Sequence, residues 1–175
     1  YGYNTDYFGI VYTVNKSGVD IKNKKVLILG SGGASVTAQT AMRDLGAGEV
    51  ITISRKGENN YENIFRHSDA EIIINCTPVG MYPHTEDTPI DISRFPCLEG
   101  VVDVIYNPRR TALLLQAEDL GIPCSDGLPM LVAQAKSASE LWQGKSIPDT
   151  ETPRIEALLR RSMRNIVLIG MPGCG

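Results

Sequence analysis

A glycine-rich turn between an apolar run and a helical pattern is the part of the sequence best suited to chemistry. The turn reads Gly30-Ser31-Gly32-Gly33-Ala34 and follows the apolar run 26–29. A strand, a glycine turn and a helix start in this order place free backbone N–H groups and the positive helix end beside a bound phosphate. The spacing Gly-x-Gly-Gly-Ala is close to the dinucleotide fingerprint, and Ala34 is small enough for close helix–strand packing. The pattern therefore predicts a dinucleotide cradle, against the alternative of a simple turn.

Ser54-Arg55-Lys56 stands at the end of the second predicted strand, where dinucleotide enzymes discriminate between NAD and NADP. A carboxylate at this place would accept hydrogen bonds from the ribose 2′-hydroxyl and repel a 2′-phosphate, and none is present. Arg55 can bind a phosphate through two hydrogen bonds and stack on adenine, and Lys56 adds a second positive charge. We therefore predict NADP as the cofactor. The alternative is a solvated basic pair at a strand end.

Alternating apolar and amphipathic segments predict the scaffold that positions these residues. The expected strands are 26–29, 49–54, 70–75, 100–105 and 122–124, and the expected helices are 6–16, 34–45, 57–67, 111–120 and 127–142. Thr5 or Asp6 is expected to cap the first helix. Strands that alternate with helices form a parallel sheet covered on both faces, with a crevice at the carboxyl ends of the strands. The sequence therefore predicts a doubly wound α/β fold in three layers, α/β/α.

Composition narrows the classes of function. The chain has 175 residues, 42% of them hydrophobic, and a net charge of −3, which gives no basic surface for nucleic acid. No apolar run approaches the roughly 20 residues that span a bilayer, and no signal peptide is visible, so we expect no membrane partner and a cytoplasmic location. The four cysteines are far apart and are expected to be buried free thiols: Cys76, Cys97, Cys124 and Cys174. We expect no metal site.

The last thirty residues follow a different pattern. Residues 146–153 are rich in proline and polar residues and predict a linker, and an arginine-rich segment follows to residue 164. Residues 165–175 form an apolar run that enters a glycine turn, with Gly170 and Gly175 spaced as in the phosphate loop Gly-x-x-x-x-Gly-Lys-[Ser/Thr]. We expect a longer polypeptide that continues into a second nucleotide-binding domain. The alternative is a glycine-rich end that arises by chance.

Six motifs, taken together, resemble the NADP-binding domain of shikimate dehydrogenase, a Rossmann-like domain. They are Gly2-Tyr-Asn-Thr-Asp6, Gly30-Ser-Gly-Gly-Ala34, Ser54-Arg55-Lys56, Asn75-Cys-Thr-Pro-Val-Gly-Met81, Asp103-Val-Ile-Tyr-Asn-Pro108 and Gly127-Leu-Pro-Met-Leu-Val-Ala-Gln134. The resemblance covers residues 1–145, and residues 165–175 resemble the start of shikimate kinase. It implies a dehydrogenase–kinase fusion in chorismate and aromatic amino-acid biosynthesis, with residues 146–164 as linker and helix.

The resemblance also implies roles for individual residues. Shikimate dehydrogenase reduces 3-dehydroshikimate to shikimate with NADPH beside a Lys–Asp pair, and the aspartate falls on Asp6, which without the resemblance is better explained as a helix cap. Beyond the glycine turn and residues 54–56, cofactor contacts fall on Thr77, Pro78, Val104 and Gly127. Substrate contacts fall on Tyr106 and Gln134.

The sequence departs from the family pattern in three ways. The family commonly has Asn-Arg-Thr where this chain has Ser54-Arg55-Lys56, and the segment 55–69 is shorter, which predicts a reduced strand–helix element. The family's catalytic lysine and its carboxylate-binding serines belong to a domain that would precede this chain, so we expect the chain alone to be inactive and still able to bind the cofactor. Two alternatives stay open, a quinate-type dehydrogenase and a non-catalytic NADP-binding module.

Overall fold

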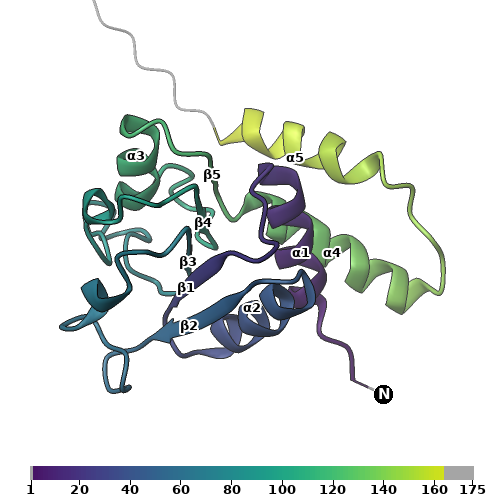
Figure 1. Cartoon of the computed structure of the whole chain (residues 1–175). Coiled ribbons are helices and arrows are strands. Elements are labelled where there is room, and N and C mark those ends of the chain that lie inside the picture. Colours follow the sequence, from purple (N-terminus) through teal and green to yellow (C-terminus); the bar gives the residue numbers. More distant parts are fainter. Residues whose placement is uncertain (1, 164–175) are drawn as a thin grey trace, which may run out of the picture.

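Five parallel strands form one sheet at the centre of the molecule (Figure 1). A computed structural model describes residues 2–163. The strands lie in the order β2-β1-β3-β4-β5, so that β1, β3 and β4 each lie between two other strands. Their bounds are β1 Lys25–Leu29, β2 Glu49–Ile53, β3 Ile72–Asn75, β4 Gly100–Asp103 and β5 Cys124–Ser125. All neighbouring pairs are parallel, as the alternation of strands and helices predicts.

Helices cover both faces of the sheet, which confirms the three-layer α/β/α prediction (Figure 1). One face carries α1, α2 and α4, and the other carries α3 with two short 3₁₀ turns, η1 and η2. The bounds are α1 Thr5–Ser17, α2 Gly33–Asp44, η1 Ile64–His67, η2 Ile92–Arg94, α3 Ala112–Asp119, α4 Leu128–Gln143 and α5 Glu151–Ser162. The last helix, α5, packs on α4.

The apolar strands supply both cores because successive side chains point to opposite faces. Val26 and Ile28 pack with α1, α2 and α4, whereas Leu27 and Leu29 pack with α3 and the 3₁₀ turns. All four side chains are fully buried. A strand that is buried on both faces has an unbroken apolar run, which explains why the sequence predicts these segments well.

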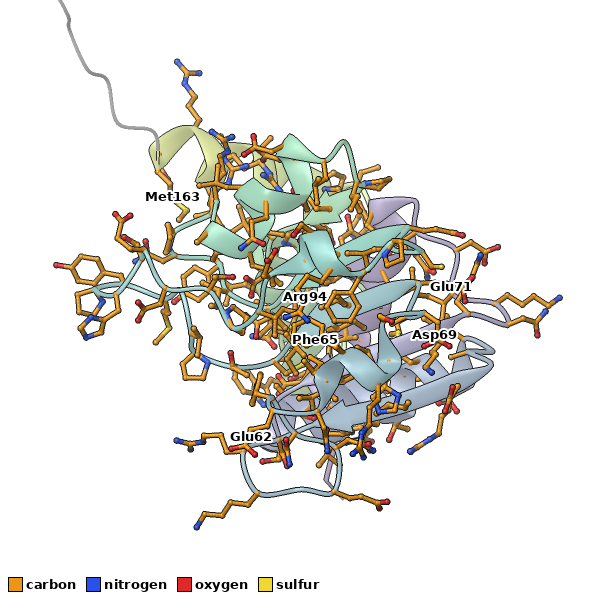
Figure 2. All side chains as sticks on the ribbon, turned by 60° about the vertical axis from the view of Figure 1, so that its left-hand side comes forward. Glu62, Phe65, Asp69, Glu71, Arg94 and Met163 are labelled. Atoms are coloured by element: carbon orange, nitrogen blue, oxygen red, sulfur yellow. The ribbon has the colours of Figure 1, made fainter. Side chains whose placement is uncertain are left out.

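The second face is thinner, and the helix expected at 57–67 is wrong. Only η1 is helical there, because asparagine side chains bind the backbone in its place. Asn63 Nδ2 donates to the carbonyl of Glu58 at 2.8 Å, and the side-chain oxygen of Asn60 accepts from the Glu62 N–H at 2.9 Å. The layer is completed by Phe65, whose ring centroid lies 3.3 Å from the guanidinium carbon of Arg94 (Figure 2).

Two predictions about the chain termini need correction. Asn4, and not Thr5 or Asp6, caps α1, because its side-chain oxygen accepts from the Tyr7 N–H at 3.3 Å. The linker expected at 146–153 ends early, since α5 begins at Glu151 with Pro153 in its first turn, where a missing N–H costs no helical hydrogen bond. The phosphate-loop motif at 165–175 lies outside the described residues.

Cysteine burial also differs from the expectation. Cys76 and Cys124 are free thiols that are half-buried, Cys97 is exposed, and Cys174 lies outside the described residues. The expectation of buried thiols is therefore wrong for Cys97, which follows Pro96 in a surface loop. Within residues 2–163, no helix is long and apolar enough to cross a membrane, and no three His, Cys, Asp or Glu side chains are grouped as metal ligands.

Candidate cofactor and substrate site

The glycine turn joins β1 to α2 at the carboxyl edge of the sheet. Gly30 has φ +107°, which side chains rarely adopt, and a Cβ there would lie 3.1 Å from the Cys76 carbonyl oxygen. A Cβ on Gly32 or Gly33 would meet no atom within 4 Å, so the start of α2 faces open space. The Ser35 hydroxyl donates to the Gly30 carbonyl at 2.7 Å and holds the turn. The free N–H groups of the first helical turn are thus exposed to an anion.

A cavity of about 640 Å³ opens beside this turn, and we call it the cofactor cavity. Its walls come from the ends of β1, β2 and β3 and from the loop that precedes η2. The residues are Gly30, Ser31, Gly32, Ser54, Arg55, Tyr61, Cys76, Thr77, Pro78, Val79, Thr88 and Pro89. Seven residues assigned to the cofactor from the sequence therefore share one cavity: Gly30, Ser31, Gly32, Ser54, Arg55, Thr77 and Pro78. Gly33 and Ala34 continue the turn into α2, and Lys56 is an exposed neighbour of Arg55.

Arg55 provides positive charge at the β2 side of the cofactor cavity. No ion pair within the described part of the chain includes Arg55 or Lys56, so neither cation is neutralised by a carboxylate there. Tyr61 lines the same cavity and packs against the core on its other side. Burial raises the pKa of Tyr61, while the charge of Arg55 acts in the opposite direction, as expected for two neighbouring groups. An unpaired guanidinium beside a fixed aromatic ring suits a phosphate next to a flat base.

A buried network of polar side chains shapes the floor between β3 and β4. Asn75 and Asp103 are paired in register at the last position of their strands, and Asn75 Nδ2 donates to Asp103 Oδ1 at 3.1 Å. The Thr111 hydroxyl donates to Asp103 Oδ2 at 2.7 Å. On the other side, the backbone N–H and the hydroxyl of Thr77 both donate to Asn75 Oδ1, at 3.0 and 2.7 Å. The network therefore fixes the Thr77–Pro78 loop against the sheet.

Burial controls the protonation of two groups in this floor. It raises the pKa of Asp103 to about 6, although hydrogen bonds from Ile105, Thr111 and Asn75 favour the ionised form. It also raises the pKa of the Cys76 thiol to about 12. A thiol with such a pKa stays protonated at neutral pH and is no nucleophile. Cys76 is therefore a wall of the cavity and no reactive group.

A second cavity of about 400 Å³ continues from the first, and we call it the substrate-side cavity. It shares Cys76, Thr77 and Pro78 with the cofactor cavity and adds residues of the loops after β3 and after β4. The added residues are Met81, Tyr82, Val104, Ile105, Tyr106 and Asn107. Val104 and Tyr106 thus lie together, and the Tyr106 side chain is exposed. Gly127 lies against Val104, where any Cβ would overlap the Val104 carbonyl.

Asp6 and Gln134 lie on two helices that pack closely. Gly9 of α1 contacts Met130 of α4, where an added Cβ would lie 2.8 Å from the Met130 carbonyl oxygen. Thr13 and Gly127 line one small internal space, so the helices run antiparallel. Asp6 and Gln134 each stand about one turn beyond the Gly9–Met130 contact. Gln134 Oε1 is buried and accepts no hydrogen bond from the described residues, so it offers an acceptor for a ligand donor.

Several lining residues have no signal in the sequence. Thr88 reaches the cofactor cavity and Tyr82 the substrate-side cavity from loops with no periodic pattern. Tyr61 reaches the cofactor cavity from a segment whose spacing predicts a helix and gives no sign of a ligand contact. Asn75 and Asp103 do carry a usable signal, because a polar residue directly after an apolar strand marks the carboxyl edge of a sheet. Their role in holding Thr77 depends on the register between β3 and β4, which the sequence does not contain.

A parallel sheet with a glycine turn after its first strand and cavities at the carboxyl ends defines a Rossmann-like α/β fold. Ligands of this class bind in the crevice at those strand ends. The glycine turn, the unpaired Arg55 and the cofactor cavity together fit a dinucleotide, whose pyrophosphate would lie at the start of α2.

Comparisons with known proteins point to one set of relatives. The shikimate dehydrogenase (NADP(+)) of Clostridium beijerinckii is 36% identical over 155 residues, covering 82% of this chain and 57% of that protein. Among solved structures, shikimate dehydrogenase 1 from Peptoclostridium difficile has 37% identity and a TM-score of 0.84, covering 93% of this chain and 63% of that one.

A third relative was solved with ligands. It is shikimate 5-dehydrogenase from Thermus thermophilus in complex with NADP(H) and shikimate, at 29% identity and TM-score 0.79, covering 93% of this chain and 64% of that one. No protein-family model matches the chain. The chain spans a little over half the length of the curated relatives that it matches.

Proposed function

We propose that the chain is the NADP(H)-binding part of a shikimate dehydrogenase, which reduces 3-dehydroshikimate to shikimate. The observation that carries this proposal is the cofactor cavity, in which the glycine turn and the unpaired Arg55 face the same space. Similarity to shikimate dehydrogenases over most of the chain supports it. NADPH supplies the hydride in this reaction. The chain would bind the pyrophosphate at the start of α2 and the 2′-phosphate at Arg55, with Lys56 as a further charge.

The substrate roles are part of the same proposal. Tyr106 and Gln134 would bind substrate hydroxyl groups, and Gln134 Oε1, which accepts no hydrogen bond from residues 2–163, supports that assignment. Asp6 would work with a lysine from another part of the enzyme to move the proton that accompanies the hydride. Thr77 and Pro78 would line the cofactor, and Val104 and Gly127 would border its nicotinamide end.

We propose that a further domain, which supplies the lysine, covers the face formed by α1 and α4. A groove on this face is lined in part by exposed aromatic side chains, among them Tyr3 at 68% and Phe8 at 52%. Trp142, on α4, is 86% exposed. The exposed apolar groups along the groove suit a covering domain. The chain without that domain is expected to be inactive, and the reaction to take place in the cytoplasm.

A fusion with shikimate kinase stays a proposal that depends on residues 165–175 alone. Gly170 and Gly175 have phosphate-loop spacing. Reading the parent gene tests it, because a Lys-[Ser/Thr] pair must follow Gly175 in a phosphate loop. The rates at which the complete polypeptide oxidises shikimate and quinate separate the alternatives. A quinate-type dehydrogenase should oxidise quinate faster than shikimate, and a non-catalytic module should oxidise neither.

Replacing Arg55 tests the cofactor assignment. We expect the chain to bind NADPH at least about tenfold more tightly than NADH, and Arg55→Asp to remove most of this preference because the 2′-phosphate loses its cation. Titration calorimetry with both cofactors measures the effect. Arg161→Asp, an equal charge change at an exposed α5 position, is the control and should leave both affinities unchanged. Equal binding of NADH and NADPH by the unmodified chain would contradict the assignment.

A further inference from the structure

Helix α5 has a buried carboxylate that must be paired. The Glu156 side chain is 4% exposed, and a buried carboxylate is costly unless cations and donors surround it. Arg160 Nε donates to Glu156 Oε1 at 2.8 Å, and the Lys16 ammonium at the end of α1 pairs with the other oxygen. Glu156 therefore links α5 to α1.

Arg160 extends this link to a second buried carboxylate. Its two terminal nitrogens donate to both oxygens of Asp126, at 3.1 and 3.2 Å, in a bidentate arrangement. Asp126 is 7% exposed and also accepts from Arg109 Nε at 3.1 Å and from the Leu128 N–H at 3.1 Å. We call the chain Arg109–Asp126–Arg160–Glu156–Lys16 the ion ladder. Arg160 is its centre, because it uses Nε for one carboxylate and both terminal nitrogens for the other.

The ion ladder connects the three segments that carry the proposed substrate residues. Lys16 lies in the last turn of α1, which carries Asp6 in its first turn. Asp126 precedes Gly127 and α4, which carries Gln134. Arg109 lies three residues after Tyr106 in the loop that follows β4. None of the ladder residues lines either cavity, and Arg109 comes nearest in sequence, two residues after Asn107 of the substrate-side cavity. The three segments joined by the ladder contribute Tyr106 to the substrate-side cavity and no residue to the cofactor cavity, so the ladder is connected to the substrate side and not to the glycine turn or Arg55.

We propose that Arg160 is a positioning residue for the substrate side of the site, holding the Tyr106 loop, α1 and α4 in register through the ion ladder. The expected effect on the KM for shikimate rests on the proposed function. The claim that α5 holds the Tyr106 loop in place depends only on the contacts of the ion ladder. A guanidinium is needed for this role because lysine cannot form the three directed hydrogen bonds.

The test compares Arg160→Gln, Arg160→Lys and the exposed control Arg161→Gln in the complete polypeptide that contains this chain. We expect Arg160→Gln to raise the KM for shikimate about tenfold, with the KM for NADP+ within about twofold of the unmodified enzyme. Arg160→Lys keeps the charge and should give an intermediate KM. Arg161→Gln should change neither value.

Hydrogen exchange of the backbone amides in residues 104–110 gives a readout that needs no activity. Faster exchange there in Arg160→Gln supports the proposal even if shikimate is not the substrate, in which case the proposed function alone fails. Faster exchange confined to α5, or a shikimate KM that stays unchanged in an active Arg160→Gln enzyme, would overturn the proposal. If Arg160→Gln does not fold, Arg160→Lys and Glu156→Gln are compared by the same exchange measurement with the same two outcomes.

Discussion

The two ends of the sheet use charge in opposite ways. At the amino ends of the strands, Lys24 pairs with Glu71 and Glu99, and Lys25 pairs with Glu49 and Asp69. At the carboxyl ends, the strands finish in buried Asn75 and Asp103, whose partners are amide, hydroxyl and backbone N–H groups. The amino end thus satisfies its charges within the protein. The carboxyl end uses neutral donors to build a floor and keeps a cation, Arg55, for a ligand.

The largest loss of stability is expected at Gly127, where two backbone segments are in contact at the carboxyl end of the sheet. Gly127→Ala places a methyl group on the Val104 carbonyl, and neither backbone can give way easily. We expect a loss of about 3 kcal/mol or more in the free energy of unfolding, measured by urea denaturation. Gly144→Ala is the matched control: φ is +62° but a Cβ there meets nothing within 4 Å, so the cost should be about 1 kcal/mol. Equal losses of unfolding free energy in the two variants would show that the backbone at Val104 moves to accept a methyl group, and would contradict this prediction.

A pH-dependent effect is expected from the buried carboxyl. The pKa of Asp103 is about 6 in the folded chain and near 4 when unfolded, so the folded state keeps a proton that the unfolded state has lost between these values. Stability from this group is therefore present below about pH 4 and is lost as pH rises to about 6, by about 2–3 kcal/mol.

Asp103→Asn removes this titration and measures its size. Between about pH 4 and about pH 7, the unfolding free energy of the unmodified chain should fall by about 2–3 kcal/mol relative to that of Asp103→Asn. Urea denaturation at pH steps across this window measures it. Parallel curves for the two proteins would contradict the raised pKa.

The smallest effect is expected at the amino end. Glu71 accepts from Lys24 Nζ at 2.8 Å and from the Lys25 N–H at 2.9 Å, and these two hydrogen bonds, that of Lys24 first, keep its pKa below the ordinary value. Because these groups are partly exposed, water and salt screen them. Glu71→Gln should lower the melting temperature less than Gly127→Ala does, and the difference from the unmodified chain should shrink in about 0.5–1 M salt. If Glu71→Gln lowered the melting temperature as much as Gly127→Ala does, the contacts at the amino end would contribute as much to stability as those at the carboxyl end, and the prediction would be wrong.

The sequence predicts the sheet better than it predicts the loops. Buried parallel strands have unbroken apolar runs, so the predicted bounds of β1, β3 and β4 lie close to the observed ones. The first helix is predicted, but not its cap, because Asn4, Thr5 and Asp6 are adjacent and each can cap a helix. Residues 57–67 have helical spacing of Tyr61, Ile64 and Phe65, yet tertiary packing and asparagine side chains give turns.

The candidate site is predictable in part for the same reason. Residues of the glycine turn, Arg55 and Thr77 follow strands directly, so strand order places them together at one edge. Tyr61 and Thr88 reach the cofactor cavity through turn and loop conformations that the sequence patterns of their segments do not predict. The ion ladder is not predictable, because Lys16 and Glu156 are far apart in the chain and meet only after α5 has packed on α4.

The central position of β1 has a consequence for how the chain folds as it is synthesised. Val26 is paired with both Val50 and Ile72, and all strand pairs described here are parallel, so none is joined by a tight hairpin. Each pairing requires a long loop to close before any ladder hydrogen bond forms. A nascent chain that has not reached Ile72 therefore holds β1 with one free edge. We expect the sheet to form only after β3 has left the ribosome, and the unpaired edge of β1 to need protection until then.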